Sequence, residues 1–167
     1  MTRDGLTGLI KHASIKEALQ TEWETVRRHP RSFSVVMLDI DHFKAVNDTY
    51  GHAVGDLVIA SVGTLLRQHF RSTDKLGRYG GEEFALVLPN CSAEIAARLV
   101  NGLREAFAAI QFMGAGQRFS CTLSAGVIDN QKFPEASPEA LIDQADKALY
   151  RAKRGGRNRV CRAEDTE

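Results

Sequence analysis

The most restrictive stretch of the sequence is "RYGGEEFALVLP", residues 78–89, which joins a glycine pair to two glutamates and then to an apolar run. A glycine pair between two extended segments predicts a β-hairpin, since glycine enters the positive-φ conformations that tight hairpin turns require. The apolar run is too short for a helix and is typical of a buried strand. The pattern therefore places the carboxylates of Glu82 and Glu83 where a turn enters the core.

A second apolar segment, "SFSVVMLDI" at residues 32–40, also ends in acids, here Asp39 and Asp41. If the two strands are neighbours in one sheet, their carboxylates converge and suit Mg²⁺, which takes one or two protein carboxylates and completes its shell with water and substrate phosphate. The alternative is that these acids are solvated strand ends. Spacing leaves open whether Asp39 or Asp41 is the ligand, because alternate residues share a strand face, and whether Glu82 or Glu83 is, because these two should point to opposite faces.

Helical spacing of apolar residues predicts four longer helices. The first, at 13–28, starts with Ser14 and Glu17 in capping-box spacing. Residues 54–70, 92–110 and 137–153 follow, with Ser92 as a cap, with Pro138 at a first helical position, and with an end at Gly155 and Gly156. Further strands are expected at 118–129 and, briefly, at 159–161.

This order of elements favours an α/β sandwich, of the α+β type, in which helices flank a mostly antiparallel sheet. The chain has 167 residues, of which 43% are hydrophobic, enough for one core. We expect one domain over residues 1–162 and a disordered acidic tail over 163–167.

The charge balance excludes several classes of partner. A net charge of +1, from 22 basic and 21 acidic residues, gives no general attraction to a nucleic acid polymer or to anionic lipid. No apolar run approaches the roughly 20 residues that cross a bilayer, and the first residues lack the order of a secretory signal. We therefore expect a cytoplasmic protein without a membrane segment. The three cysteines are expected to be reduced thiols, and the five histidines form no metal-binding pattern.

The sequence "GRYGGEEF" strongly resembles the signature of the GGDEF family, the diguanylate cyclases, in its variant with Glu at the third position. The resemblance extends over nearly the whole chain, through "DGLTGL", "LDIDHFKAVNDTYGHAVGD", "RSTD", "TLSAGV" and "DKALYRAKRGGRN". Such a resemblance implies a ferredoxin-like, polymerase-palm-like domain that joins two GTP molecules into cyclic di-GMP and releases two pyrophosphates. It also implies two Mg²⁺ ions per active site, for which Mn²⁺ may substitute. Because the product has two equivalent links and the chain has one GTP site, the active species should be a homodimer.

Carried over by position, the resemblance implies a role for each of several residues. Asp39 and Glu82 look like the side-chain metal ligands, with the Ile40 carbonyl assisting, and Glu83 is similar to the residue that aids proton removal from the 3′-hydroxyl. Asn47 and Asp56 match the positions that read guanine. The phosphate-binding candidates are the backbone N–H groups of His42, Phe43 and Lys44, the side chains of Lys153 and Arg157, and, more weakly, the Lys44 side chain.

Arg71 and Asp74 of "RSTD" match the RxxD site at which the family binds its product as an inhibitor. On an ungapped count, a further family arginine aligns with Gly102, although Arg98 and Arg104 lie one helical turn or less away. We expect weaker product binding here.

Lys11 and His12 stand where the family usually has Asn and Arg, which leaves their local role open. The alternative to a cyclase is a non-catalytic module that binds GTP or cyclic di-GMP and signals through a partner. The sequence does not identify a sensory input.

Overall fold

The structure is a computed structural model, and it describes residues 2–165. Three strands form the centre of the molecule. They are β2 (Phe33–Ile40), β4 (Glu83–Pro89) and β7 (Leu123–Asp129), and nearly all of their residues are buried. The remaining elements are β1 (Ile10–Lys11), α1 (His12–Arg28), α2 (Phe43–Tyr50), α3 (His52–His69), β3 (Lys75–Arg78), α4 (Ala93–Ala108), β5 (Phe112–Gly114), β6 (Gln117–Phe119), α5 (Pro138–Arg154) and β8 (Val160–Arg162).

The main sheet has the strand order β1-β3-β4-β2-β7-β8. The three central pairings, β3 with β4, β4 with β2 and β2 with β7, are antiparallel, whereas the short edge strands β1 and β8 pair in parallel. The order β3-β4-β2-β7 is that of a ferredoxin-like βαββαβ unit. The predicted α+β sandwich with a mostly antiparallel sheet is therefore confirmed.

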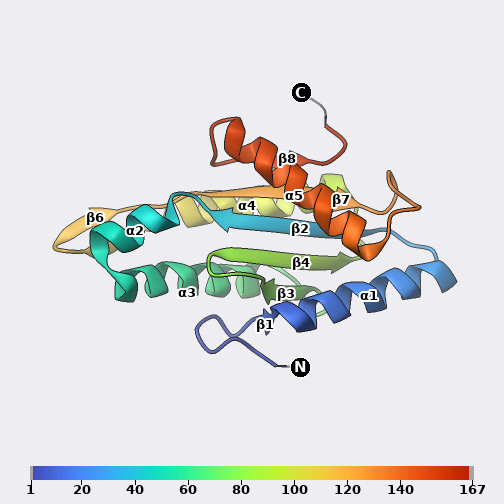
Figure 1. Ribbon diagram of the computed structural model, residues 1–167, viewed down its shortest axis with the longest axis horizontal. Coiled ribbons are helices and arrows are strands. Elements are labelled where there is room, and N and C mark those ends of the chain that lie inside the picture. Colours follow the sequence, from blue (N-terminus) through green and yellow to red (C-terminus); the bar gives the residue numbers. More distant parts are fainter. Residues whose placement is uncertain (1, 166–167) are drawn as a thin grey trace.

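Helices cover both faces of the sheet, and Figure 1 shows α1 and α5 in front of it with α4 behind. Side chains that alternate along β2 divide between two apolar clusters. Val36 and Leu38 pack with residues of α2, α3 and α4, whereas Val35 and Met37 pack with residues of α1 and α5. The end of β2 therefore lies between α2 on one side and the last turns of α5 on the other.

Two of the predicted helix starts are confirmed by their caps. The Ser92 hydroxyl accepts the N–H of Ile95 at 3.3 Å, and the Ser137 hydroxyl accepts the N–H of Ala140 at 3.1 Å. The predicted capping box at Ser14 is wrong, because α1 already begins at His12 with Lys11 as a cap that makes no side-chain bond. The short strand β1 runs straight into this helix and so moves its start towards the N-terminus.

The hairpin around the glycine pair is present as β3 and β4, but the reason given for it is wrong. Neither Gly80 nor Gly81 has a positive φ. Instead the turn is closed by the Glu83 carbonyl, which accepts the N–H groups of Tyr79 at 2.8 Å and Gly80 at 3.2 Å. The glycines therefore serve for space rather than for left-handed backbone.

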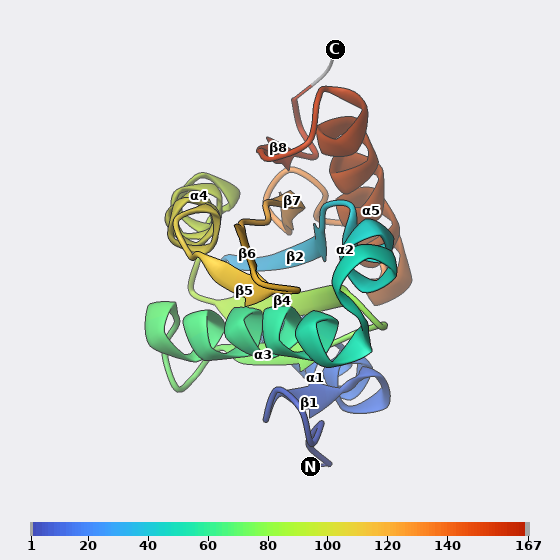
Figure 2. The same cartoon turned by 90° about the vertical axis from the view of Figure 1, so that its left-hand side faces the viewer.

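The strand predicted at 118–129 is two strands, since β6 ends at Phe119 and β7 begins at Leu123. β6 pairs instead with β5 in a hairpin that the pattern missed, and Figure 2 shows this hairpin above α3. Its two turn residues, Ala115 and Gly116, have φ values of 51° and 76°. Positive φ at both positions is typical of a type I′ turn, but Ala is a poor signal for one.

The last strand, predicted at 159–161, is β8 at Val160–Arg162. Ala163 then donates its N–H to the Val127 carbonyl at 2.8 Å, and Glu164 pairs with Arg162 at 2.8 Å. Residues 166 and 167 of the predicted tail lie outside the described residues, and the domain boundary at 162 stays a prediction. Within 2–165, no helix combines the length and the apolar character that crossing a bilayer requires.

Candidate active site

Strand pairing brings the two acidic segments together. In the register of β2 with β4, Asp39 lies opposite Glu83. One residue further, the Ile40 N–H donates to the Glu82 carbonyl at 3.2 Å. Backbone hydrogen bonds therefore fix the end of β2 against the glutamates of the turn, as the sequence predicts for neighbouring strands.

The electrostatics of this site oppose ionisation of its carboxylates. Burial raises the pKa of Asp39, and Asp41 raises it further, although the Lys153 ammonium contacts the Asp39 carboxylate and acts in the opposite direction. Burial also raises the pKa of Glu82, together with the charges of Asp39 and Glu83. Raised pKa values in a cluster of like charges are typical of functional sites.

Asp41 has a different environment from Asp39, although spacing made the two residues equivalent. The carboxylate of Asp41 accepts the hydroxyls of Thr122 and Ser124, both at 2.7 Å, and the N–H of Asn158 at 3.0 Å. A carboxylate that already accepts from three protein donors has less capacity left for a cation than one without them. The chain leaves the strand at Ile40, so the alternation that made the two aspartates equivalent ends before Asp41.

The donor set at this site fits Mg²⁺. Asp39 and Glu82 offer carboxylate oxygens that repel one another, and a divalent cation would relieve that repulsion. Across residues 2–165, no three His, Cys, Asp or Glu side chains are grouped so that they could hold a metal by themselves. Two carboxylates with the balance supplied by water and substrate phosphate is how Mg²⁺ is usually bound.

Glu83 begins β4 on the sheet face that carries Ala85 and Val87, the side covered by α1 and α5. Its charge raises the pKa of Asp146, an α5 residue, although burial of Asp146 is the larger cause. No role is assigned to Asp146 from the sequence, although this residue begins the "DKALYRAKRGGRN" segment. The site thus has more negative charge than the two motifs contain.

The two glycines of the turn differ in the space around them. A β-carbon at Gly80 would lie 2.7 Å from Oε1 of Glu83, whereas one at Gly81 would meet nothing within 4 Å. Arg78 fixes the turn by donating to the Gly81 carbonyl at 2.9 Å, and it also donates to the Asp4 carboxylate at 3.1 Å. The N-terminal "DGLTGL" motif therefore braces the turn and leaves the space over Gly81 open.

A second contact between the N-terminal region and the turn comes from His12, one of the two departures from the family pattern. Its ring stacks on Tyr79 with a centroid distance of 4.0 Å, and its Nδ1 lies 2.8 Å from the Tyr79 carbonyl oxygen. Lys11, the other departure, pairs with Arg78 in the β1–β3 register. His12 therefore contacts the first residue of the turn, and Lys11 pairs with the last residue of the strand before it.

The two guanine candidates lie on adjacent helices, Asn47 on α2 and Asp56 on α3. Oδ1 of Asn47 is buried and makes no hydrogen bond within the described residues, which is unusual for a buried polar atom. Gly55 lies directly beside it, and a β-carbon there would collide with that oxygen. Asp56 is exposed. The two helices therefore present one carboxylate and one amide whose oxygen has no protein partner.

The phosphate candidates come from two places. α2 begins at Phe43, so the N–H groups of Phe43 and Lys44 lie in a first helical turn, where the helix supplies no acceptor. His42 precedes them with a left-handed φ of 55°. The Lys44 side chain is exposed and pairs with Asp48 at 3.2 Å. The backbone, rather than the Lys44 ammonium, is therefore placed like a helix N-terminal anion site.

Lys153 lies in the last turn of α5, and Arg157 lies in the loop that follows. Arg157 and Asn158 are both left-handed, with φ values of 64° and 48°. The Arg157 charge acts on Asp39 and lowers its pKa, although burial of Asp39 outweighs it. Lys153 therefore contacts the Asp39 carboxylate directly, whereas Arg157 lies in the loop beyond the helix and acts on Asp39 through its charge.

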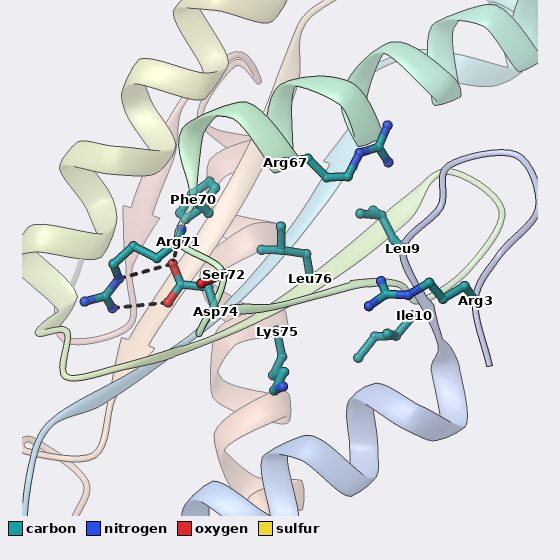
Figure 3. A pocket seen from close by; sticks show the side chains of 10 residues that line it. All are labelled: Arg3, Leu9, Ile10, Arg67, Phe70, Arg71, Ser72, Asp74, Lys75 and Leu76. Carbon is teal, nitrogen blue, oxygen red and sulfur yellow. Dashed lines mark hydrogen bonds and ion pairs between the residues drawn. The ribbon is translucent and has the colours of Figure 1, made fainter. Parts of the chain in front are cut away.

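The two residues of the RxxD motif, Arg71 and Asp74, are hydrogen-bonded to each other. Arg71 donates its backbone N–H to Asp74 at 2.9 Å, and its guanidinium donates to Asp74 at 3.1 Å and to the Pro89 carbonyl at 2.6 Å. The Arg71 side chain is 55% exposed but that of Asp74 only 2%, so Asp74 orients Arg71 in this conformation. Figure 3 shows the pair at one end of a cavity of about 360 Å³, which Arg3, Arg67 and Lys75 also line.

Gly102 is exposed on α4, and a β-carbon there would meet nothing within 4 Å. Its neighbour Arg104 is bound elsewhere, to Asn101 and Asn158, both at 2.8 Å. Arg104 is therefore not free to substitute at the RxxD site in this conformation.

Comparison with known proteins identifies relatives along the whole chain. The family model described as "Diguanylate cyclase, GGDEF domain" matches residues 1–159. The chain is 41% identical over 157 residues to diguanylate cyclase DgcP of Pseudomonas aeruginosa, covering 94% of this chain and 23% of that protein. It is 39% identical to diguanylate cyclase VdcA of Vibrio cholerae, covering 94% of this chain and 45% of that protein. The chain thus spans less than half the length of these curated relatives.

Solved structures give the same picture. The GGDEF domain of DgcB from Caulobacter crescentus, solved in complex with cyclic di-GMP, matches with a TM-score of 0.93 and 34% identity, covering 98% of this chain and 94% of that chain. The active GGEEF domain of a diguanylate cyclase from Vibrio cholerae matches with a TM-score of 0.87 and 31% identity, covering 95% and 99%.

Proposed function

The chain belongs to the GGDEF family, and from this premise we propose that it is a diguanylate cyclase. It would condense two GTP molecules into cyclic di-GMP, a signalling nucleotide, and release two pyrophosphates. The observation that carries the proposal is the convergence of Asp39 and Glu82 at one end of the sheet, where the Lys153 ammonium contacts the Asp39 carboxylate. Opposed groups of carboxylates and cations are what phosphoryl transfer from a nucleotide requires.

Asp39 and Glu82 would hold two Mg²⁺ ions, or Mn²⁺ in their place, with the Ile40 carbonyl assisting. When bound, these ions would neutralise the charge that develops on the α-phosphate and on the leaving pyrophosphate. The rigidity of the site supports this assignment, because the backbone of Asp39 is fixed by the β2–β4 pairing and that of Glu82 by its carbonyl, which accepts the Ile40 N–H.

The reaction is an in-line displacement. The 3′-oxygen of one GTP forms a bond to the α-phosphorus of the other, and the bond from that phosphorus to the pyrophosphate oxygen breaks. The 3′-hydroxyl proton leaves to a base, for which Glu83 is our candidate because it begins the same strand, beside Glu82. The open space over Gly81 would let the α-phosphate approach the turn backbone.

Guanine would be read by Asn47 and Asp56. A carboxylate accepts from guanine N1–H and its 2-amino group, and an amide serves the acceptors of the base. The buried Asn47 oxygen without a protein partner supports a ligand at this position. The outer phosphates would be bound by Lys153, Arg157 and the N–H groups at His42, Phe43 and Lys44.

One GTP site per chain cannot supply both halves of a two-fold symmetric product in one step. Two chains facing each other about a two-fold axis would place each 3′-hydroxyl against the α-phosphate of the partner's nucleotide. We therefore propose that the active species is a homodimer.

The proposal is tested by incubating the chain with GTP and Mg²⁺ and separating the nucleotides by chromatography. We expect cyclic di-GMP and pyrophosphate from the parent and neither from Asp39→Asn. If the parent binds GTP but makes no cyclic di-GMP at high protein concentration, the alternative of a non-catalytic binding module replaces this proposal.

Cyclic di-GMP would also inhibit by binding at Arg71, with Asp74 orienting the guanidinium. Because Gly102 provides no side chain, we expect weaker binding than a full arginine set would give. Calorimetric titration of cyclic di-GMP should show binding to the parent that Arg71→Ala abolishes. Equal binding by both proteins would exclude this site, and nanomolar binding by the parent would exclude the expected weakening.

A further inference from the structure

We infer that Asp41, Asn158 and Arg104 form a clamp that positions Arg157 for the outer phosphates of GTP. The inference rests on the proposed function, in which the loop after α5 binds phosphate. The three clamp residues are positioning residues, because they act on the nucleotide through Arg157.

The first part of the clamp is the Asp41 carboxylate, which is 5% exposed. It accepts the Asn158 N–H at 3.0 Å, and the same N–H lies 3.1 Å from the Ser124 hydroxyl, which is itself bound to Asp41. A buried carboxylate with three donors is a rigid anchor, since removing one donor would leave charge uncompensated. The second acid of "LDID" is thereby tied to the loop that follows α5.

The second part is an unfavourable backbone conformation held in place. After Gly156, with a φ of 122°, Arg157 and Asn158 are both left-handed. An L-residue with a β-carbon does not adopt this conformation without support, and Asn tolerates it better than most. The Arg157 N–H donates to the Ala152 carbonyl at 3.0 Å, so the loop is fixed at both ends of this pair. Strain that surrounding contacts hold in place is a recurrent feature of ligand sites.

The third part comes from α4. Nη1 of Arg104 donates to Oδ1 of Asn158 at 2.8 Å, and Nε of Arg104 donates to Asn101 at 2.8 Å. Asn158 is therefore held through its backbone by the β2 end and through its side chain by α4. The contact joins two residues 54 positions apart. Such a contact fixes the loop against the helical layer on the other face of the sheet from α5.

The clamp determines where the Arg157 guanidinium lies. The Arg157 N–H donates to the carbonyl of Ala152, the residue before Lys153. The Lys153 ammonium contacts the Asp39 carboxylate, so the loop begins at the acidic end of the sheet. The left-handed Asn158 follows Arg157 directly and would fix the direction in which the Arg157 side chain leaves the loop. Loosening the clamp would let Arg157 move away from the carboxylates without changing any group that touches the base. The clamp therefore predicts a loss of affinity that depends on the outer phosphates alone.

The test compares two ligands by calorimetry in the presence of Mg²⁺: 3′-deoxy-GTP, which lacks the attacking hydroxyl, and GMP, which lacks the outer phosphates. Asn158→Ala should bind 3′-deoxy-GTP about tenfold more weakly, the size expected when one charge-assisted contact is lost. GMP binding should stay unchanged. Asn158→Asp, which keeps an acceptor for Arg104 and tolerates left-handed backbone, should restore most of the triphosphate affinity.

Two matched controls separate the clamp from general destabilisation. Asn90 is also left-handed, with a φ of 53°, but lies after β4. Asn90→Ala should therefore carry the same backbone cost without changing triphosphate binding. Arg104→Ala should weaken 3′-deoxy-GTP binding by about threefold, Arg98→Ala should not, and the pair Arg104→Ala with Asn158→Ala should be no weaker than Asn158→Ala alone.

The inference is overturned if Asn158→Ala weakens GMP and 3′-deoxy-GTP equally, if it changes neither, or if the parent itself does not prefer the triphosphate. Formation of cyclic di-GMP by the parent is scored separately. A parent that discriminates between the two ligands as expected but makes no product would contradict the proposed function and leave the clamp standing.

Discussion

The carboxylate turn, residues 79–83, and the cation loop, residues 155–158, face the same end of the sheet but are held in different ways. The turn is fixed by backbone pairing, since β4 is hydrogen-bonded to β2 and β3 along its length. The loop has no strand partner at these residues; it is held by backbone bonds to the last turn of α5, such as that from the Arg157 N–H to the Ala152 carbonyl, and by the side chains of Asp41 and Arg104. Both regions carry groups that we assign to the same nucleotide.

The difference shows two ways in which a fold positions functional side chains. Backbone pairing places Asp39 and Glu82 wherever the strands are adjacent, almost regardless of the neighbouring side chains. The cation loop instead depends on left-handed residues and on a buried carboxylate more than 100 positions away in sequence. We therefore expect the turn to govern chemistry and the loop to govern affinity.

The largest expected effect is on kcat, and it separates the residues of the turn from those of the loop. Asp39→Asn or Glu82→Gln should lower kcat by about a thousandfold or more, because electrostatic stabilisation of the transition state is lost. Arg157→Ala should instead raise KM for GTP about tenfold with a smaller change in kcat. Steady-state rates of pyrophosphate release measure both, with Asp143→Asn as an exposed control on α5. Unchanged kcat in a folded Asp39→Asn protein would reject the metal assignment.

The next effect lies inside the turn. Gly81→Ala should lower kcat/KM by about tenfold or more while changing stability by less than about 0.5 kcal/mol, because its β-carbon would enter open space that the α-phosphate needs. Gly80→Ala should instead displace the Glu83 carboxylate, since its β-carbon would lie 2.7 Å from Oε1 at the flexible end of that side chain, and should therefore lower kcat with little change in stability. Denaturation curves and initial rates on both variants separate the two glycines, and full activity in Gly81→Ala would contradict the approach of phosphate over this residue.

A third variant concerns guanine recognition by Asp56, which belongs to neither the turn nor the loop. Asp56→Ala should weaken GTP and GMP equally, by about tenfold, because it leaves guanine donors unpaired at a cost of about 1–3 kcal/mol. Glu17→Ala, which removes an exposed acid on α1, serves as the control in calorimetry. Undiminished GTP binding by Asp56→Ala would move guanine recognition elsewhere.

The smallest effect concerns stability. The pKa of Glu82 lies above its ordinary value of 4.5, through burial and through the charges of Asp39 and Glu83. Because the pKa is raised in the folded state, the contribution of this carboxyl to the free energy of unfolding is fully present at low pH. That contribution is lost as pH rises through the folded-state pKa. Glu82→Gln should therefore raise Tm by about 1–3 °C at pH 8 in the presence of a chelator, and the gain should vanish towards pH 4.5. Exposed Glu17→Gln should show no such trend; a pH-independent gain at Glu82 would contradict the repulsion.

The sequence predicts the features that depend on local patterns and misses those that depend on contacts between distant residues. The strand ends, the hairpin and the caps at Ser92 and Ser137 were predictable because each depends on local patterns. The separation of Asp39 from Asp41 was not, because it depends on where β2 ends and on hydroxyls of β7. The β5–β6 hairpin was missed since its turn carries Ala115 at a left-handed position. An Asn after the Gly155–Gly156 pair was the one local sign of the left-handed loop.

The central claim, that two copies of this chain join two GTP molecules, is tested most directly by the initial rate of cyclic di-GMP formation per chain across a dilution series with saturating GTP and Mg²⁺. We predict that the rate per chain rises with protein concentration and levels off, because the reacting species is a dimer. Sedimentation on the same samples should place the rise where monomer converts to dimer. A rate per chain that stays flat from monomer to dimer, or GTP turnover that yields no cyclic di-GMP at any concentration, would contradict the account.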